Sequence, residues 1–271
     1  MILKDCKEFT SKWKKNIKER VAAMKKIPSL AIVQIGSVEA SNRYIRNKIK
    51  DCQEVGISAH HYGFDESITQ DQLILEVLDL QMHYDSIIIQ LPVPAHIDIK
   101  HVIEFIRPEW DVDGFRSDSP HTPCTPGGIM RYLDYCDFDL AGKNVTIIGR
   151  SDIVGKPLAK LMTNADATVT LCHSKTRNLY QHIFTADLLV TAIGKAKKIN
   201  CYPIHIPVID VGINFDENGK MCGDCNNTEN RDVTPVPGGV GLMTRCMLLE
   251  NVCNAAELVK EIYDNSKSKW S

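Results

Sequence analysis

Three residues with chemically useful side chains share one face of an expected helix. Ser41, Tyr44 and Lys48 stand at positions i, i+3 and i+7 within residues 39–55. The Tyr-x-x-x-Lys spacing puts a phenol one helical turn from an amine, which is a useful pair for moving protons. A surface Tyr–Lys pair without chemistry explains the same spacing when it is taken alone.

Two further polar groups stand where ligands bind in open α/β sheets. Gln90 ends the apolar strand expected at 86–91, and Asp113 lies in a stretch rich in Pro, Gly, Ser and Asp at 108–126. A strand-end amide and a carboxylate between two domains can hydrogen-bond a flat heterocycle at the mouth of a cleft. A capping Gln and a turn-forming Asp are the alternatives for each residue by itself.

A glycine turn in the second half is typical of phosphate binding. The strand expected at 145–148 runs into GRSDIVGKP at 149–157 and then into a helix. Gly149 opens the turn, but Ser151 occupies the second glycine position of G-x-G-x-x-G, and a turn without a ligand remains an equal alternative. Gly149 also follows Tyr44, whereas the glycines of short-chain dehydrogenases precede their Tyr-x-x-x-Lys pair, which argues against that class.

The next strand favours NADP over NAD. An NAD site usually has an acidic residue about 20 positions after the glycines. Residues 168–177 contain no Asp or Glu and offer Ser174, Lys175 and Arg177 instead. Together with Arg150, these groups suit a 2′-phosphate through charge-assisted hydrogen bonds. The alternative is that these cations are merely solvated.

Alternating strands and helices position these residues. The expected fold class is α/β, with two βα domains flanking a cleft, the second a Rossmann-type doubly wound parallel sheet. The predicted bounds are 1–120 plus a C-terminal helix at about 245–271 for the first domain, and 121–244 for the second. The expected strands are 29–35, 60–64, 86–91, 145–148, 168–172, 188–193 and 208–211, and the expected helices include 39–55, 69–83, 99–106 and 243–263.

Composition excludes several classes of protein. The 271 residues carry 32 Lys+Arg and 34 Asp+Glu, and a net charge of -2 argues against a dedicated nucleic-acid binder. No apolar run is long enough to span a membrane. The ten cysteines are scattered behind no signal peptide, which predicts reduced thiols and a cytoplasmic location. No His pattern suggests a catalytic metal, and Cys222-x-x-Cys225 is interpreted as an exposed turn.

The first 27 residues carry an excess of basic side chains, with nine Lys or Arg against three Asp or Glu. Phe9, Trp13, Ile17 and Val21 recur every four residues on one helical face. The alternatives are a membrane-surface element and a transit peptide, and the second is weakened because such peptides are poor in acidic residues. We therefore expect a surface helix that buries its apolar face.

The motifs together resemble the bifunctional methylenetetrahydrofolate dehydrogenase/cyclohydrolases along nearly the whole chain. The matching strings are ASNRYIRNK (40–48), QLPVP (90–94), DVDGF (111–115), PCTPGGI (123–129), GRSDIVGKP (149–157), ATVTLCHSKT (167–176), DVGIN (210–214) and TPVPGGVG (234–241). Eight strings in the same order make a far more specific match than any one of them.

The resemblance implies two reactions. NADP takes a hydride from 5,10-methylenetetrahydrofolate, and water then converts 5,10-methenyltetrahydrofolate into 10-formyltetrahydrofolate. By position in the family, the catalytic residues are Lys48, Gln90 bonded to it, Tyr44 stacked on the folate ring and Asp113 on the pterin edge. The NADP contacts are Gly149, Arg150, Ser151, Ser174 and Ile213, and a homodimer without metal, membrane or nucleic acid is implied.

Departures from the family pattern leave alternatives open. Leu242 stands where the family usually has a proline that borders the folate pocket, Glu39 also replaces a proline, and the loop after Phe115 is shorter. A dehydrogenase with weak or lost cyclohydrolase activity is the first alternative. The second is a non-catalytic folate- or nucleotide-binding protein, which would not need Lys48. Cys124, in the string TPCTP, is expected near the chemistry and is a candidate reactive thiol.

Overall fold

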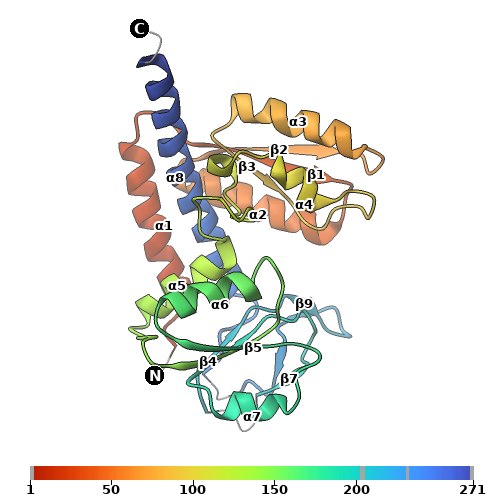
Figure 1. The fold of residues 1–271 in the computed structure, drawn as a ribbon, viewed down its shortest axis with the longest axis vertical. Coiled ribbons are helices and arrows are strands. Elements are labelled where there is room, and N and C mark those ends of the chain that lie inside the picture. Colours follow the sequence, from red (N-terminus) through yellow and green to blue (C-terminus); the bar gives the residue numbers. More distant parts are fainter. Residues whose placement is uncertain (1–2, 202–204, 230–231, 269–271) are drawn as a thin grey trace. The chain divides into compact units, whose positions relative to one another are not determined.

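The computed structural model describes residues 3–201, 205–229 and 232–268 and divides into two compact units (Figure 1). We call Trp13–Cys124 with Leu248–Ser271 the three-stranded unit, and Met1–Lys12 with Thr125–Met247 the four-stranded unit. Helix α1 (Cys6–Ala23) contributes residues to both. Its first residues group with the four-stranded unit because Phe9 packs against Tyr132 and Tyr135, with ring centroids 5.6 and 4.9 Å away.

The three-stranded unit is a parallel βα sheet in the order β2-β1-β3. Its strands are β1 (Ser29–Ile35), β2 (Ser58–Phe64) and β3 (Ser86–Ile89), and its helices include α2 (Glu39–Val55), α3 (Gln70–His83) and α4 (Ile99–Glu104). Strand β1 is buried from Leu30 to Ile35 and mostly apolar, as is typical of a parallel strand that helices cover on both faces. The predictions of β1 and α2 are confirmed to the residue, whereas β2 starts two residues earlier than predicted and β3 ends at Ile89.

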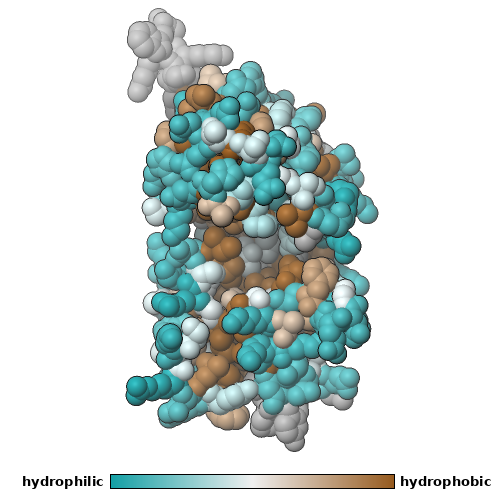
Figure 2. Space-filling model, turned by 90° about the vertical axis from the view of Figure 1, so that its right-hand side faces the viewer, coloured by the Kyte–Doolittle hydropathy of each residue, from teal (hydrophilic) through white to brown (hydrophobic). Residues whose placement is uncertain are grey.

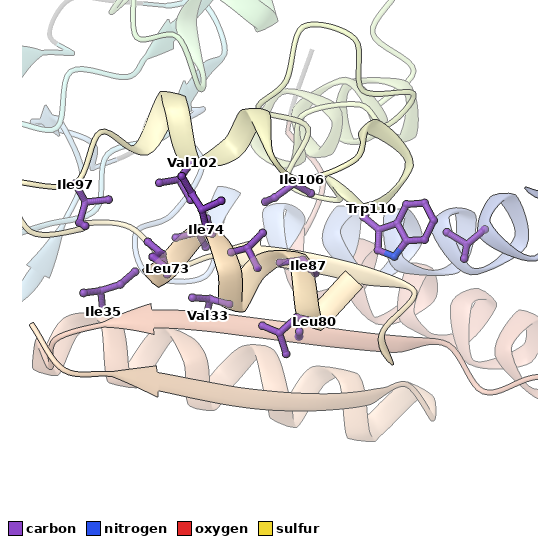
Figure 3. Packing of buried hydrophobic residues seen from close by; sticks show 14 residues of the cluster. Val33, Ile35, Leu73, Ile74, Leu80, Ile87, Ile97, Val102, Ile106 and Trp110 are labelled. Atoms are coloured by element: carbon purple, nitrogen blue, oxygen red, sulfur yellow. The ribbon is translucent and has the colours of Figure 1, made fainter. Parts of the chain in front are cut away.

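The core of this unit lies between the sheet, α3 and α4 (Figure 3). Val33 and Ile87 from the sheet pack with Leu73 from α3 and Val102 from α4, all fully buried. Trp110 joins the same cluster and donates its indole N–H to the Tyr84 carbonyl at 2.8 Å. The stretch predicted as a break at 108–126 is therefore packed, and it begins with the 3-10 helix η1 (Pro108–Trp110).

The four-stranded unit carries a parallel sheet in the order β5-β4-β6-β8. The order reverses between β4 and β6, the arrangement of a doubly wound sheet that binds ligands at the carboxyl ends of those strands. The strands of the sheet are β4 (Asn144–Ile148), β5 (Thr168–Cys172), β6 (Leu188–Thr191) and β8 (Val208–Asp210), and the helices are α5 (Cys124–Tyr135), α6 (Gly155–Asn164) and α7 (Leu179–Phe184). Helix α8 (Val240–Ser268) begins in this unit, and from Leu248 on it belongs to the three-stranded unit.

Four short strands in this unit were not expected from the sequence. They are β7 (Ile199–Asn200), β9 (Asn214–Phe215), β10 (Met221–Cys222) and β11 (Cys225–Asn226), and two-residue strands are too short for a periodic pattern. The prediction that Cys222-x-x-Cys225 forms an exposed turn is wrong, because Cys222 lies in β10, Cys225 lies in β11, and both residues are buried. Helix α8 begins three residues before the predicted 243 and runs on to Ser268, past the predicted 263.

Hydrophilic side chains cover most of the face of each unit drawn in Figure 2. The apolar stripe of α1 is buried, as the sequence predicts: Phe9, Trp13, Ile17 and Val21 are each less than a tenth exposed. Within the described part of the chain, no helix is long and apolar enough to cross a membrane.

Candidate active site

A buried amine and an amide meet at the edge of the three-stranded sheet. Lys48 projects from α2 and is only 7% exposed, and its Nζ donates to Gln90 Oε1 at 3.1 Å. Gln90 directly follows β3, and its N–H extends the sheet by bonding the Val33 carbonyl at 2.8 Å. This is the point where the order β2-β1-β3 reverses, which is where α/β sheets bind ligands.

The amide of Gln90 is fixed at both ends. Its Nε2 donates to the Leu91 carbonyl at 2.8 Å, which leaves Oε1 to accept from Lys48. Ser41, one turn before Tyr44 on α2, lies 3.5 Å from the same carbonyl. Tyr44 is partly buried and stands one turn before Lys48 on the same face of α2.

Asp113 supplies a carboxylate close to this amine. Burial raises its pKa, while the charge of Lys48 and a hydrogen bond from Cys124 act in the opposite direction. Cys124 is itself buried and donates its thiol to the Val112 carbonyl at 3.2 Å. Burial, with the Asp113 charge adding to it, raises the pKa of this thiol well above its ordinary value. Cys124 is thus a neutral hydrogen-bonding group, and the hypothesis of a reactive thiol is not supported.

Two residues that hold Asp113 in place were missed at the sequence level. Asn251 on α8 is fully buried and donates to the carbonyls of Val112 and Thr122, both at 2.9 Å, so it clamps the two sides of this loop. Its own carbonyl oxygen has no hydrogen-bond partner within the part of the chain that the structure describes. The sequence offers little signal for it, because the string MLLENVCNAAELV (247–259) holds four polar residues and only the packing shows that Asn251 is the fully buried one.

Asp111 is the second missed residue, and it organises the turn around Asp113. Its carboxylate accepts from the backbone N–H groups of Gly114 at 3.2 Å and Arg116 at 2.8 Å. Burial raises the pKa of Asp111 to about 6, since desolvation of the charge outweighs these bonds.

This raised pKa predicts a pH-dependent stability. A carboxyl whose pKa is higher in the folded than in the unfolded state contributes stability below its unfolded pKa, and this contribution is lost as the pH rises through about 6. We therefore expect the unfolding free energy of the native chain to fall between pH 4 and pH 7 relative to an Asp111→Asn variant, by at most about 3 kcal/mol. Urea unfolding of both proteins across that range measures the difference. Parallel curves would contradict this prediction.

The four-stranded unit holds the glycine turn. Gly149 follows β4 with φ +126°, and a Cβ there would lie 2.1 Å from the Ala192 carbonyl oxygen. A Cβ on Gly155, the first residue of α6, would lie 2.0 Å from the Gly149 oxygen. Only bare backbone fits at both positions, and bare backbone lets a pyrophosphate approach closely. The turn thus fits a dinucleotide.

Ser151 closes this turn. Its Oγ accepts from the N–H groups of Val154 at 3.2 Å and Gly155 at 3.4 Å, so the hydroxyl satisfies donors at the start of α6. Arg150, next to it, has an exposed side chain. The serine in the second glycine position therefore serves the turn itself, which explains the departure from G-x-G-x-x-G.

The carboxyl end of β5 offers hydroxyls and cations. The His173 N–H donates to Thr176 Oγ1 at 2.8 Å, and the Lys175 N–H donates to His173 Nδ1 at 3.1 Å, which forms a tight turn with Ser174 exposed at its tip. Ile213 follows β8 and is 42% exposed, so a large apolar side chain faces solvent at the same edge of the sheet. The predicted site residues therefore form two groups, four in the three-stranded unit and five in the four-stranded unit.

Comparisons with known proteins assign both parts of the chain to one family. Residues 5–113 match the family model described as the catalytic domain of tetrahydrofolate dehydrogenase/cyclohydrolase, and residues 123–260 match its NAD(P)-binding domain. The chain is 43% identical to the bifunctional protein FolD of Campylobacter curvus, covering 95% of this chain and 96% of that protein. It is 41% identical to FolD of Bacillus mycoides, covering 92% and 94%.

Solved structures extend the similarity to the fold. The bifunctional FolD enzyme of Campylobacter jejuni superposes with a TM-score of 0.89 at 38% identity, covering 93% of this chain and 97% of that one. FolD of Trypanosoma brucei, solved with NADP cofactor and an inhibitor, gives a TM-score of 0.88 at 30% identity over 95% and 98%. With both family domains matched in order along the chain, this protein belongs to the tetrahydrofolate dehydrogenase/cyclohydrolase family.

Proposed function

We propose that this protein oxidises 5,10-methylenetetrahydrofolate with NADP and then hydrolyses the resulting 5,10-methenyltetrahydrofolate to 10-formyltetrahydrofolate. The observation that carries this proposal is the buried Lys48 amine, held by Gln90 and close enough to Asp113 for its charge to act on that carboxyl. A buried amine that a neighbouring amide orients can take a proton from an attacking water molecule. A protein that only binds folate or nucleotide would not need such an amine.

The oxidation step depends on positioning. The reacting carbon lies between two nitrogens, so loss of a hydride leaves a delocalised cation and no base is needed. NADP, when bound, accepts the hydride. Tyr44 is proposed to stack on the folate ring, and Asp113 to accept hydrogen bonds from the pterin edge, so that together they orient the carbon. The turn at Gly149, with Ser151, is proposed to hold the pyrophosphate, and Ile213 to cover the nucleotide with an apolar side chain.

The hydrolysis step needs a proton acceptor. Water adds to the cationic carbon and loses a proton, which the neutral amine of Lys48 takes. The bond from this carbon to N5 then breaks while the added hydroxyl loses its proton and its oxygen forms the C=O bond. N5 takes up one proton, the formyl group stays on N10, and one proton is released to solvent. Gln90 Oε1 accepts from Lys48 Nζ at 3.1 Å and so directs the amine during both transfers.

The preference for NADP rests on Arg150 and Ser174. We expect Arg150→Ala to lower kcat/KM for NADP by about tenfold or more while changing that for NAD little, because a charge-assisted hydrogen bond to the 2′-phosphate is lost. Initial rates with both dinucleotides measure the change. Lys160→Ala, which removes an exposed positive charge from α6, is the matched control. An equal loss with both dinucleotides would contradict the assignment of Arg150.

The proposed function as a whole is tested by incubating the protein with methylenetetrahydrofolate and NADP. Absorbance of NADPH and of methenyltetrahydrofolate, followed together, separates the two reactions. NADPH formation without accumulation of the methenyl compound supports the bifunctional enzyme. Accumulation favours the alternative that Leu242 raises, a dehydrogenase with weak cyclohydrolase activity, and no NADPH at all would reject the enzyme.

We also propose a homodimer in the cytoplasm, and light scattering of the purified chain tests the dimer.

A further inference from the structure

A fully buried carboxylate joins two segments at the ligand edge of the four-stranded sheet. Asp224, between the two cysteines of the C-x-x-C string, is 0% exposed. Its Oδ2 accepts from the N–H groups of Ile193 at 2.7 Å and Gly194 at 3.3 Å. Its Oδ1 accepts from the Lys195 N–H at 2.8 Å and from Asn214 Nδ2 at 3.0 Å. One side chain therefore ties three successive backbone amides to β9.

A second buried carboxylate holds Asp224 in place. Asp210, at the end of β8 and 3% exposed, accepts from the Asp224 N–H and the Gly212 N–H with Oδ1, both at 3.0 Å, and from the Cys225 N–H with Oδ2 at 2.9 Å. The packing leaves no spare space, since a Cβ on Gly212 would lie 2.4 Å from Asp224 Oδ1 and one on Gly223 would lie 2.0 Å from Asp210 Oδ2. The two carboxylates thus form one rigid connection.

The segments that Asp224 joins lie beside the glycine turn. Residues 193–195 follow β6, and the carbonyl of Ala192 is the atom that a side chain on Gly149 would strike. Residues 212–214 follow β8, the next strand in the sheet, and include Ile213. Both segments stand at the carboxyl edge where the dinucleotide is proposed to bind, yet Asp224 itself is buried beneath them.

We infer that Asp224 is a positioning residue for the dinucleotide: it fixes residues 193–195 and Ile213 in the arrangement that receives the cofactor, without touching it. This inference rests on the proposed function. Preorganised segments bind a ligand more tightly because no ordering cost is incurred at binding. The segments that Asp224 joins follow β6 and β8, whereas Arg150 follows β4 and Ser174 follows β5 on the other side of the sheet. Because Arg150 and Ser174 are the residues proposed to bind the 2′-phosphate, we expect Asp224 to affect the binding of NADP and of NAD alike.

The variant Asp224→Asn in the full chain tests this inference. An amide offers one acceptor oxygen, so the N–H groups that face its NH2 group lose their acceptor. In one orientation these are the N–H groups of Ile193 and Gly194, and in the other the Lys195 N–H, since the Asn214 amide can turn its oxygen toward the new NH2 group. We expect the KM for NADP to rise at least about tenfold with little change in kcat, and the KM for NAD to rise by the same factor. Hydrolysis of methenyltetrahydrofolate without dinucleotide should keep its kcat and KM, because its residues lie in the other unit.

Asp216→Asn is the matched control. It makes the same chemical change in the same part of the chain, but Asp216 binds Lys197 and the N–H groups of Asn218 and Lys220 rather than the 193–195 segment. Its KM for NADP should stay at the native value. An unchanged KM for NADP in Asp224→Asn, or an equal rise in Asp216→Asn, would overturn the inference.

Asn214→Ala covers the case in which Asp224→Asn fails to fold. It removes one of the four donors and keeps the carboxylate, so a rise of about threefold in the KM for NADP is expected; no rise would again overturn the inference. Calorimetric titration of the native chain with NADP separates this question from the proposed function. If the native protein binds no NADP, the proposed function fails; if native and Asp224→Asn proteins bind it equally, only the positioning role fails.

Discussion

We expect Lys48→Met to abolish hydrolysis of methenyltetrahydrofolate and to leave hydride transfer to NADP measurable. Methionine keeps most of the length and volume of the side chain but cannot take a proton. A general base contributes about 10²–10⁴-fold, and this is the loss we expect in the hydrolysis rate. The oxidation needs no base, so its residual rate reports only the altered positioning of the substrate.

The two activities are measured on the same preparation, by the decay of methenyltetrahydrofolate absorbance without dinucleotide and by NADPH formation. Lys50→Met provides a control two residues further along α2, where the side chain is exposed. It should retain both activities. An equal loss of both activities in Lys48→Met would show that Lys48 positions the substrate for both steps rather than acting as the base of one.

The residues that do the proposed chemistry were easier to find from the sequence than those that hold them. Tyr44 and Lys48 share a helix face, and the spacing of Ser41, Tyr44 and Lys48 determines that face once the helix exists. Gln90 follows a buried apolar strand, so the sheet order alone brings it to the ligand edge. A helical period of 3.6 and short continuous apolar runs therefore predicted these positions, and the observed bounds of α2 and β1 agree with the predicted ones.

The supporting residues depend on contacts between distant parts of the chain. Asn251 bonds the Val112 carbonyl across a sequence separation of 139 residues, and Asp224 bonds Ile193 across 31. No periodicity encodes such pairs, since each depends on how whole elements pack. The buried position of Cys222 and Cys225 was missed for the same reason: two-residue strands and side-chain hydrogen bonds, rather than an apolar pattern, bury that segment.

The second large effect is expected on NADP affinity, when the first glycine of the glycine turn, Gly149, is replaced. Gly149→Ala places a methyl group 2.1 Å from the Ala192 carbonyl oxygen, which is a severe clash. The backbone of Gly149 also has a φ of +126°, which residues with a side chain rarely adopt. Ala192 cannot yield easily, because its N–H bonds the Ile148 carbonyl at 2.7 Å. The turn must therefore open, at a cost of about 3 kcal/mol or more. If that cost falls on the bound state, NADP affinity drops about a hundredfold.

Gly142→Ala separates the clash from backbone strain. Gly142 also has a positive φ, +71°, but a Cβ there meets nothing within 4 Å. It should lose about 1 kcal/mol of stability and keep the native affinity for NADP. Titration with NADP measures both variants, and hydrolysis of methenyltetrahydrofolate without dinucleotide checks that the three-stranded unit is intact in each. Native affinity in Gly149→Ala would mean that the dinucleotide binds elsewhere, because no pyrophosphate could rest on a turn that had opened to admit a side chain.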